Sequence, residues 1–117
     1  MKFEDTGLEG IVIEFQALEE IMENAGFYYG WDYERVTFDH KIVVRDEIYY
    51  FRLLAYAVEG EIPKLDSKVK LMYPLLGKHY YPHGVEYHDE VFAKNIVDKC
   101  NKKINLIKDQ IKAEAIS

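Results

Sequence analysis

The C-terminal part of the chain carries one apolar stripe with the period of an α-helix. The stripe recurs every three or four positions among charged and polar neighbours, and it consists of Ala93, Ile96, Val97, Cys100, Ile104, Ile107 and Ile111. Asp89 suits an N-cap and Glu90 suits a first helical turn, so we predict a helix from Glu90 to Ala115. Such a helix is ~39 Å long at 1.5 Å per residue. With a single apolar stripe, it needs a surface of similar length to pack on.

The segment Ile48–Val58 is the best candidate for that surface. It reads IYYFRLLAYAV, which is rich in aromatic and aliphatic residues on both faces and favours a central strand. Taken from Glu47 to Glu59, the strand would be ~43 Å long, which matches the helix. Leu53, Leu54, Ala55 and Ala57 would also suit a helix, but the run Ile48–Phe51 and the absence of a polar stripe favour a strand.

The remaining elements are shorter. We predict a strand over Leu8–Phe15, followed by an amphipathic helix that stops at Gly26 and has apolar positions at Leu18, Ile21, Met22 and Ala25. A second strand should run from Trp31 to Phe38, and a connection over Asp39–Asp46 with a turn at Asp46–Glu47 should follow it. After the long strand, we predict a strand over Lys68–Tyr73 and a short strand over Gly84–Tyr87. The predicted fold is α+β, with an antiparallel sheet of four to five strands packed on a long C-terminal helix in the order β-α-β-β-β-β-α. We expect a single domain over residues 1–117, because 49% hydrophobic and 31% charged residues are typical of one globular unit.

Charge and cysteine content restrict the partners and the compartment. The 15 Lys and Arg against 21 Asp and Glu give a net charge of −6, which disfavours nucleic acid as a partner. Residues 1–34 carry a net charge of −8 and the section from His88 onward carries a net charge of +1. These two sections either form solvated helix faces or let two copies associate through patches of opposite charge. No apolar run approaches the ~18 residues of a membrane span, and no signal-type segment follows the start. Cys100 is the only cysteine, so we predict a cytoplasmic protein with a buried, structural thiol.

Three segments resemble a known family. They are WDYERVTFD from Trp31, AYAVEGEIP from Ala55 and GKHYYPHGVEY from Gly77, and they are similar to the YugN-like family of small proteins from Bacillus and its relatives. The resemblance covers essentially the whole chain. It implies a β-α-β4-α arrangement similar to TATA-binding-protein-like or helix-grip folds. It implies no particular activity and assigns no functional residue.

Three histidines form the one cluster with metal-binding chemistry. His79, His83 and His88 lie within ten residues of one another, and imidazole is a good ligand for zinc or iron. Pro82 makes a helix improbable there, so the spacing does not bring two rings to one side, and a surface turn with ordinary histidines is the simpler interpretation. A metal-assisted enzyme built on this cluster is therefore the alternative function, and the favoured prediction includes no cofactor.

Aromatic residues and one arginine provide the other candidate sites. The densest aromatic segment runs from Phe27 to Tyr33, and its Tyr and Trp side chains suit either core packing or an interface. Arg52 lies within an apolar strand, where it either points to solvent, which we favour, or pairs with Glu34, Asp39 or Glu86. The candidate ligand or interface residues are Trp31, Tyr33, Arg52, His79, Tyr81 and His83.

The sequence favours a non-enzymatic binding or protein-interaction module. It has no nucleophile elbow, no P-loop and no dinucleotide-binding motif. One face of the long strand must lie outside the core, and each alternative set of residues is largely apolar: Tyr49, Phe51, Leu53, Ala55 and Ala57, or Ile48, Tyr50, Leu54, Tyr56 and Val58. A soluble monomer rarely exposes such a patch. We therefore predict a homodimer, with a bound small apolar or aromatic ligand or a bend of the strand around its own core as alternatives.

Overall fold

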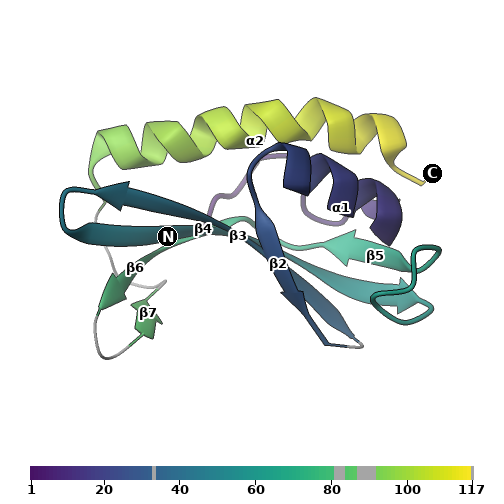
Figure 1. Ribbon diagram of the computed structural model, residues 1–117. Coiled ribbons are helices and arrows are strands. Elements are labelled where there is room, and N and C mark those ends of the chain that lie inside the picture. Colours follow the sequence, from purple (N-terminus) through teal and green to yellow (C-terminus); the bar gives the residue numbers. More distant parts are fainter. Residues whose placement is uncertain (33, 81–83, 87–91, 117) are drawn as a thin grey trace.

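The fold is an antiparallel sheet with both helices on one of its faces (Figure 1). The structure is a computed structural model, and it describes residues 1–32, 34–80, 84–86 and 92–116. The elements are β1 (Val12–Glu14), α1 (Phe15–Asn24), β2 (Tyr28–Trp31), β3 (Arg35–Val44), β4 (Glu47–Glu59), β5 (Lys68–Leu71), β6 (Leu75–Tyr80), β7 (Gly84–Glu86) and α2 (Lys94–Glu114). The predicted α+β class with a long C-terminal helix is confirmed, while the sheet has seven strands within these described residues instead of four or five.

β4 is the central strand, as the sequence predicted. The strand order is β1-β5-β4-β3-β2, and β6 pairs with both β4 and β7. Along one edge β4 pairs with β3 over the whole length of β3. Along its other edge, residues 49–52 pair with β6 and residues 55–59 pair with β5. Every described strand pairing is antiparallel.

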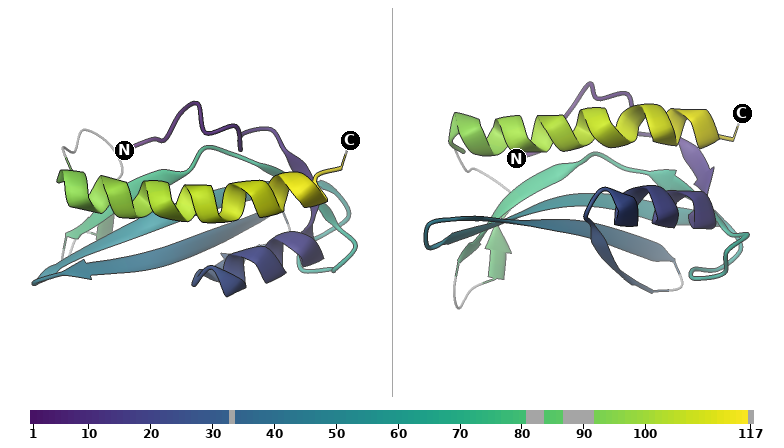
Figure 2. Two further views of the ribbon diagram at one scale, coloured as in Figure 1. Left: turned by 90° about the horizontal axis from the view of Figure 1, so that it is seen from above. Right: turned by 45° about the horizontal axis from the view of Figure 1, so that its top comes forward.

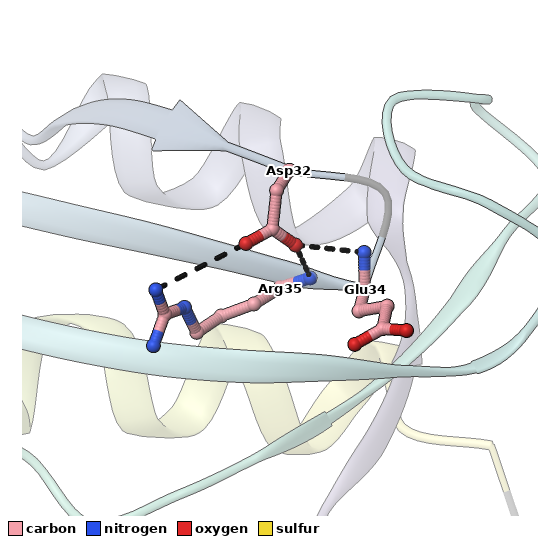
Figure 3. A network of polar contacts seen from close by, with 3 residues as sticks. All are labelled: Asp32, Glu34 and Arg35. Carbon is pink, nitrogen blue, oxygen red and sulfur yellow. Dashed lines mark hydrogen bonds and ion pairs between the residues drawn. The ribbon is translucent and has the colours of Figure 1, made fainter.

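The single strand predicted from Trp31 to Phe38 is two strands, because Asp32 forms a turn between them. Its carboxylate oxygen Oδ1 accepts hydrogen bonds from the backbone N–H groups of Glu34 and Arg35, both at 2.8 Å (Figure 3). β3 then continues to Val44, so the connection predicted over Asp39–Asp46 is wrong, and the turn lies one residue earlier, at 45–46.

Glycines shorten the first predicted strand and end the first helix. Gly7 and Gly10 have φ of +80° and +86°, so the chain turns there and β1 covers only three residues of the predicted Leu8–Phe15 strand. The stop at Gly26 is confirmed by its φ of +89°. Its N–H donates to the Glu23 carbonyl and the next N–H donates to the Met22 carbonyl, which is the Schellman arrangement.

The long helix packs on the sheet through the predicted stripe. Its buried residues are Ile96, Cys100, Ile104, Ile107 and Ile111. On β4 the residues that lie beneath the helix layer are Tyr49, Phe51, Leu53 and Ala55, and they alternate with less buried residues. The predicted start of the helix is wrong, because α2 begins at Lys94 after an extended Ala93; Asp89 and Glu90 lie outside the described residues. No helix in the described part of the chain is long and apolar enough to cross a membrane.

Candidate functional site

Both described helices lie on one side of the sheet, and neither covers its other face (Figures 1 and 2). Directly paired residues on adjacent strands point to the same side of a sheet, so the register assigns its members. One row runs Tyr28–Asp39–Arg52–Leu75 across four strands. The open face, as we call it, includes Tyr28, Arg35, Thr37, Asp39, Lys41, Val43, Ile48, Tyr50, Arg52, Leu54, Tyr56, Lys70, Leu75 and His79. Val58 lies at the β-bulge between Ala57 and Glu59, where it has no paired residue, and we count it with this face because it follows Tyr56 by two positions along β4.

Large apolar side chains gather on the open face. Of the eight large hydrophobic residues that are exposed in the described part of the chain, four lie there: Tyr28, Val43, Tyr56 and Val58, each 40–57% exposed. Leu54, Tyr50 and Ile48 lie among them and are half-buried. The second of the two residue sets predicted for the uncovered side of the long strand is therefore the exposed one, and the first belongs to the core.

An ion pair lies near the centre of the open face. The guanidinium of Arg52 donates from Nε to Asp39 Oδ1 at 2.7 Å and from Nη2 to Asp39 Oδ2 at 2.9 Å. The side chains are 31% and 15% exposed, so both charges are partly removed from solvent. Arg52 therefore lies on the uncovered face, as the favoured prediction had it, and it also pairs with Asp39, as the alternative had it. Two parallel bonds fix the plane of the guanidinium, which makes this pair a rigid feature of the face.

Aromatic rings border the ion pair. The Tyr50 and His79 rings lie 6.2 Å apart at an interplanar angle of 83°, which is an edge-to-face contact. Burial is the main cause of the raised pKa of Tyr28, and the nearby Tyr50 and Asp39 raise this pKa further. The Tyr28 hydroxyl therefore stays protonated at neutral pH and can donate a hydrogen bond.

Two of the predicted site residues share a hollow at the end of this face. Trp31 and Arg52 border a cavity of about 300 Å³ together with Gly30, Asp32, Arg35, Thr37 and Asp39. Its lining is mainly polar. The carboxylate of Asp32 also forms an ion pair with the guanidinium of Arg35, with Oδ2 and Nη2 3.9 Å apart, so the turn of Figure 3 forms one wall. His79 lies four residues along β6 from Leu75, the partner of Arg52, or ~13 Å at the rise of a strand. Tyr33, Tyr81 and His83 lie outside the described residues.

No metal centre is found in the part of the chain that the structure describes, where no three His, Cys, Asp or Glu residues converge. His83 and His88 lie outside that part, so the predicted three-histidine site stays a prediction. The thiol of Cys100 is fully buried, and burial raises its pKa to about 12. It is protonated at neutral pH, which confirms a structural thiol.

Sequence reasoning missed the contribution of β6 to the open face. Leu75 and His79 reach this face because β6 pairs with the first half of β4. The segment LLGKHY contains a glycine and follows Pro74, both of which disfavour a strand by composition. The signal that could have revealed it is the length of β4, since a 13-residue central strand needs partners along both edges.

Comparison with known proteins now identifies the family. The pattern of the YugN-like family matches residues 4–109, which include β1–β7 and most of α2. The chain belongs to the YugN-like family. YlbA of Bacillus subtilis (strain 168) is 42% identical over 115 residues, covering 96% of each chain. YugN of the same organism is 28% identical over 87 residues, covering 73% of this chain and 65% of that protein.

A solved structure from the YugN-like family has the same fold. The crystal structure of YugN from Geobacillus kaustophilus HTA426 matches with a TM-score of 0.85 and 42% identity, covering 97% of this chain and 96% of the other. The resemblance inferred from three sequence segments is thus confirmed. All residues of the open face lie within the part that matches the YugN-like family.

Proposed function

We propose that this YugN-like protein is a non-enzymatic interaction module that forms a homodimer through the open face of its sheet. The observation that carries the proposal is the concentration of exposed Tyr28, Val43, Tyr56 and Val58 on the one face that no helix covers. Burying such side chains against a partner is favourable at roughly 25 cal/mol per Å² of apolar surface. A second copy supplies a partner of matching chemistry, and twofold dimers are the commonest soluble assembly.

The size of the open face fits an interface better than a small-molecule site. At ~3.3 Å per residue and ~4.8 Å between strands, the residues of β2, β3, β4, β5 and β6 cover a plan area of ~590 Å². This area is close to the ~600 Å² that each partner contributes to a specific interface at the small end of the range. The hollow of about 300 Å³ beside Trp31 is smaller and mainly polar, so a small apolar or aromatic ligand is the less favoured occupant.

Internal pairing of charges supports association through this face. Arg52 pairs with Asp39, Arg35 with Asp32, and Lys68 on β5 with Glu59 on β4. Each pair is neutral as a unit, so a partner that covers it does not bury a net charge, whereas Lys41 and Lys70 have no ion pair with a described residue and would have to stay in contact with water at the rim. The apolar side chains between the pairs then supply the stabilisation. The lone, buried Cys100 is compatible with dimerisation in a reducing compartment, and we place the protein in the cytoplasm.

The proposal is tested by light scattering on the purified protein at micromolar concentration. We expect a mass of about twice 13.8 kDa for the natural sequence. The double variant Tyr56→Glu/Val58→Glu should run as a monomer, because both exposed side chains lie on the open face and two new carboxylates would be buried in each copy.

The matched control is Leu106→Glu on α2. Leu106 is 50% exposed, close to the 54% of Val58, but it belongs to the helix layer on the other side of the sheet. This variant should remain a dimer. The proposed interface would be refuted if the natural protein were monomeric throughout the micromolar concentration range. It would also be refuted if the control variant dissociated as completely as the double variant.

Elemental analysis of untagged protein separates this proposal from the metal-assisted enzyme. A binding module holds no stoichiometric metal. Zinc, iron or manganese bound in a one-to-one ratio and lost on substituting His83→Ala would instead support the histidine cluster as a metal site.

A further inference from the structure

One edge of β3 has no partner strand at the end that approaches α2. β3 covers residues 35–44, and β2 pairs only with residues 36–39. Within the described ranges, the outer edge of residues 40–44 pairs with no other strand. Alternate residues of an antiparallel edge direct their backbone N–H and C=O groups outward. This edge therefore offers a short row of hydrogen-bonding groups to an added strand.

A groove separates this edge from α2. It has a volume of about 440 Å³ and is lined by residues 40–43 of β3 and by Lys99, Lys102, Lys103 and Leu106 of α2. Figure 2 shows why it is open: α1 lies beside the C-terminal half of α2, while the β3–β4 hairpin extends past the end of α1. The short helix thus leaves the N-terminal half of α2 without a helical neighbour on this side among the described residues.

The groove is positively charged. Its lining residues include four lysines and His40, and no acidic residue. The ammonium group of Lys103 donates a hydrogen bond to the carbonyl of Ala25 at the end of α1, so it is already engaged within the chain. Lys41, Lys99 and Lys102 are exposed, and none of them has an ion pair with a described residue. Lys99 and Lys102 are therefore available to carboxylates on the α2 side of an added strand, and Lys41 is available to carboxylates on its open-face side.

The groove also has an apolar component. Ile42 is buried at its base and Leu106 is 50% exposed beside it, while Val43, which is 57% exposed, lies on the open-face side of β3. An incoming strand has alternating side chains, so one set faces α2, where Leu106, Lys99 and Lys102 lie, and the other set lies beside Lys41 and Val43. An unpaired strand edge, apolar contacts and flanking cations together describe a site for strand addition.

We propose that an extended, acidic segment of a partner protein docks in this groove as an additional strand on residues 40–44 of β3. A second copy of this chain is a poor occupant, because twofold pairing of β3 with β3 would bring Lys41, Lys99 and Lys102 of both copies together. The acidic section of another copy fits no better. Its cluster Glu19, Glu20 and Glu23 lies on α1, and a helix cannot add hydrogen bonds to a strand edge.

The probe is a fluorescent heptapeptide in which Glu alternates with Val, measured by fluorescence anisotropy. We expect saturable binding that weakens as salt is raised, since the lysines are exposed. Amide signals of residues 40–44 should shift in a nuclear magnetic resonance titration. The same Glu–Val peptide with every backbone amide N-methylated has the same charge but cannot donate the strand hydrogen bonds, and it should bind at least about tenfold more weakly.

The lysines are tested by the double variant Lys99→Glu/Lys102→Glu. Affinity for the Glu–Val peptide should fall by about tenfold or more, because two attractions become repulsions. The matched control is Lys64→Glu/Lys112→Glu, which changes the net charge equally at exposed positions outside the groove. This control should bind the peptide with nearly unchanged affinity.

Three results would overturn the inference. The N-methylated peptide could bind as tightly as the unmodified Glu–Val peptide, which would indicate charge attraction without strand addition. Both lysine variants could lose affinity equally, which would exclude a localised site. A single-stranded oligonucleotide could displace the peptide at lower concentration, which would make an acidic protein segment the wrong ligand class. The monomeric variant Tyr56→Glu/Val58→Glu retains the groove, so it should still bind the peptide, and failure of the dimer does not affect this test.

Discussion

The two faces of β4 are almost equally apolar in sequence but differ in what covers them. Phe51, Leu53 and Ala55 are buried beneath the helices, whereas the alternate positions Leu54, Tyr56 and Val58 stay half-buried or exposed. The difference lies in the neighbours. The covered face receives the isoleucine stripe of α2, while the open face contains the Arg52–Asp39 pair, which no helix approaches. The comparison shows that one charged residue in an apolar strand identifies the side that lies away from the core.

Adjacent leucines on opposite faces give the sharpest test of this comparison. Leu53 is 1% exposed and Leu54 is half-buried, and both lie in the same strand. Leu53→Ala should lower the free energy of unfolding by about 3 kcal/mol, because it leaves a cavity beneath the helices. Leu54→Ala should lower it by only about 1 kcal/mol in dilute protein, because less apolar surface is lost.

Urea denaturation of the two variants at low protein concentration measures both values. At high concentration, Leu54→Ala should become more costly, because the side chain then lies in the dimer interface. Equal losses for the two variants in dilute protein would mean that the two faces are covered to the same extent within one chain.

Much of the covered face could be predicted from the sequence because its signals are periodic. The stripe of α2 has a helical period, and the length of β4 matches the helix, so class, central strand and burial of Cys100 followed from local patterns. The boundaries of the individual strands and helices did not follow from these patterns. The turn that separates β2 from β3 depends on one carboxylate that accepts two backbone hydrogen bonds, and alternation alone does not indicate such a break.

The candidate sites depend on pairings between distant residues, which a single sequence does not contain. Arg52 meets Asp39 only because β3 and β4 form a hairpin in that register, and the prediction ended the strand at Phe38. The groove beside β3 arises because β2 is shorter than β3 and α1 is shorter than α2. These are differences in element length, and they are visible only when the boundaries are known.

Alkaline pH should distinguish the two faces through their titrating groups. Cys100, beneath the covered face, has its pKa raised from 9.0 to about 12 by burial. The unfolded chain therefore loses this proton at a lower pH than the folded chain does, and ionisation stabilises the unfolded state. The contribution of the protonated thiol to the stability of the folded state is complete below pH 9 and is lost progressively as the pH rises toward 12.

Between pH 8 and pH 10 we expect the natural sequence to lose about 1.4 kcal/mol more stability than Cys100→Ala, because one pKa unit corresponds to about 1.4 kcal/mol. Chemical denaturation at the two pH values measures this difference, and the tyrosines contribute equally to both proteins. Tyr28 on the open face also has a raised pKa, but it is 54% exposed, so Tyr28→Phe should change the pH dependence much less. A larger effect for Tyr28→Phe than for Cys100→Ala would contradict this assignment of the two faces.

The smallest expected effect concerns the ion pair of the open face. A double-mutant cycle with Asp39→Ala and Arg52→Ala should give a coupling energy of about 0.5–1 kcal/mol in dilute protein, because the pair is bidentate but partly solvated. Arg52→Lys keeps the charge and loses the two-bond geometry, so it should retain only part of the coupling. Added salt should weaken the coupling while the face is open, since solvent and ions reach the pair. In the dimer the partner excludes water from the pair, so the coupling should increase with protein concentration and lose its salt dependence. A coupling that is unaffected by protein concentration would place the ion pair outside the interface, even if the protein dimerises by another surface.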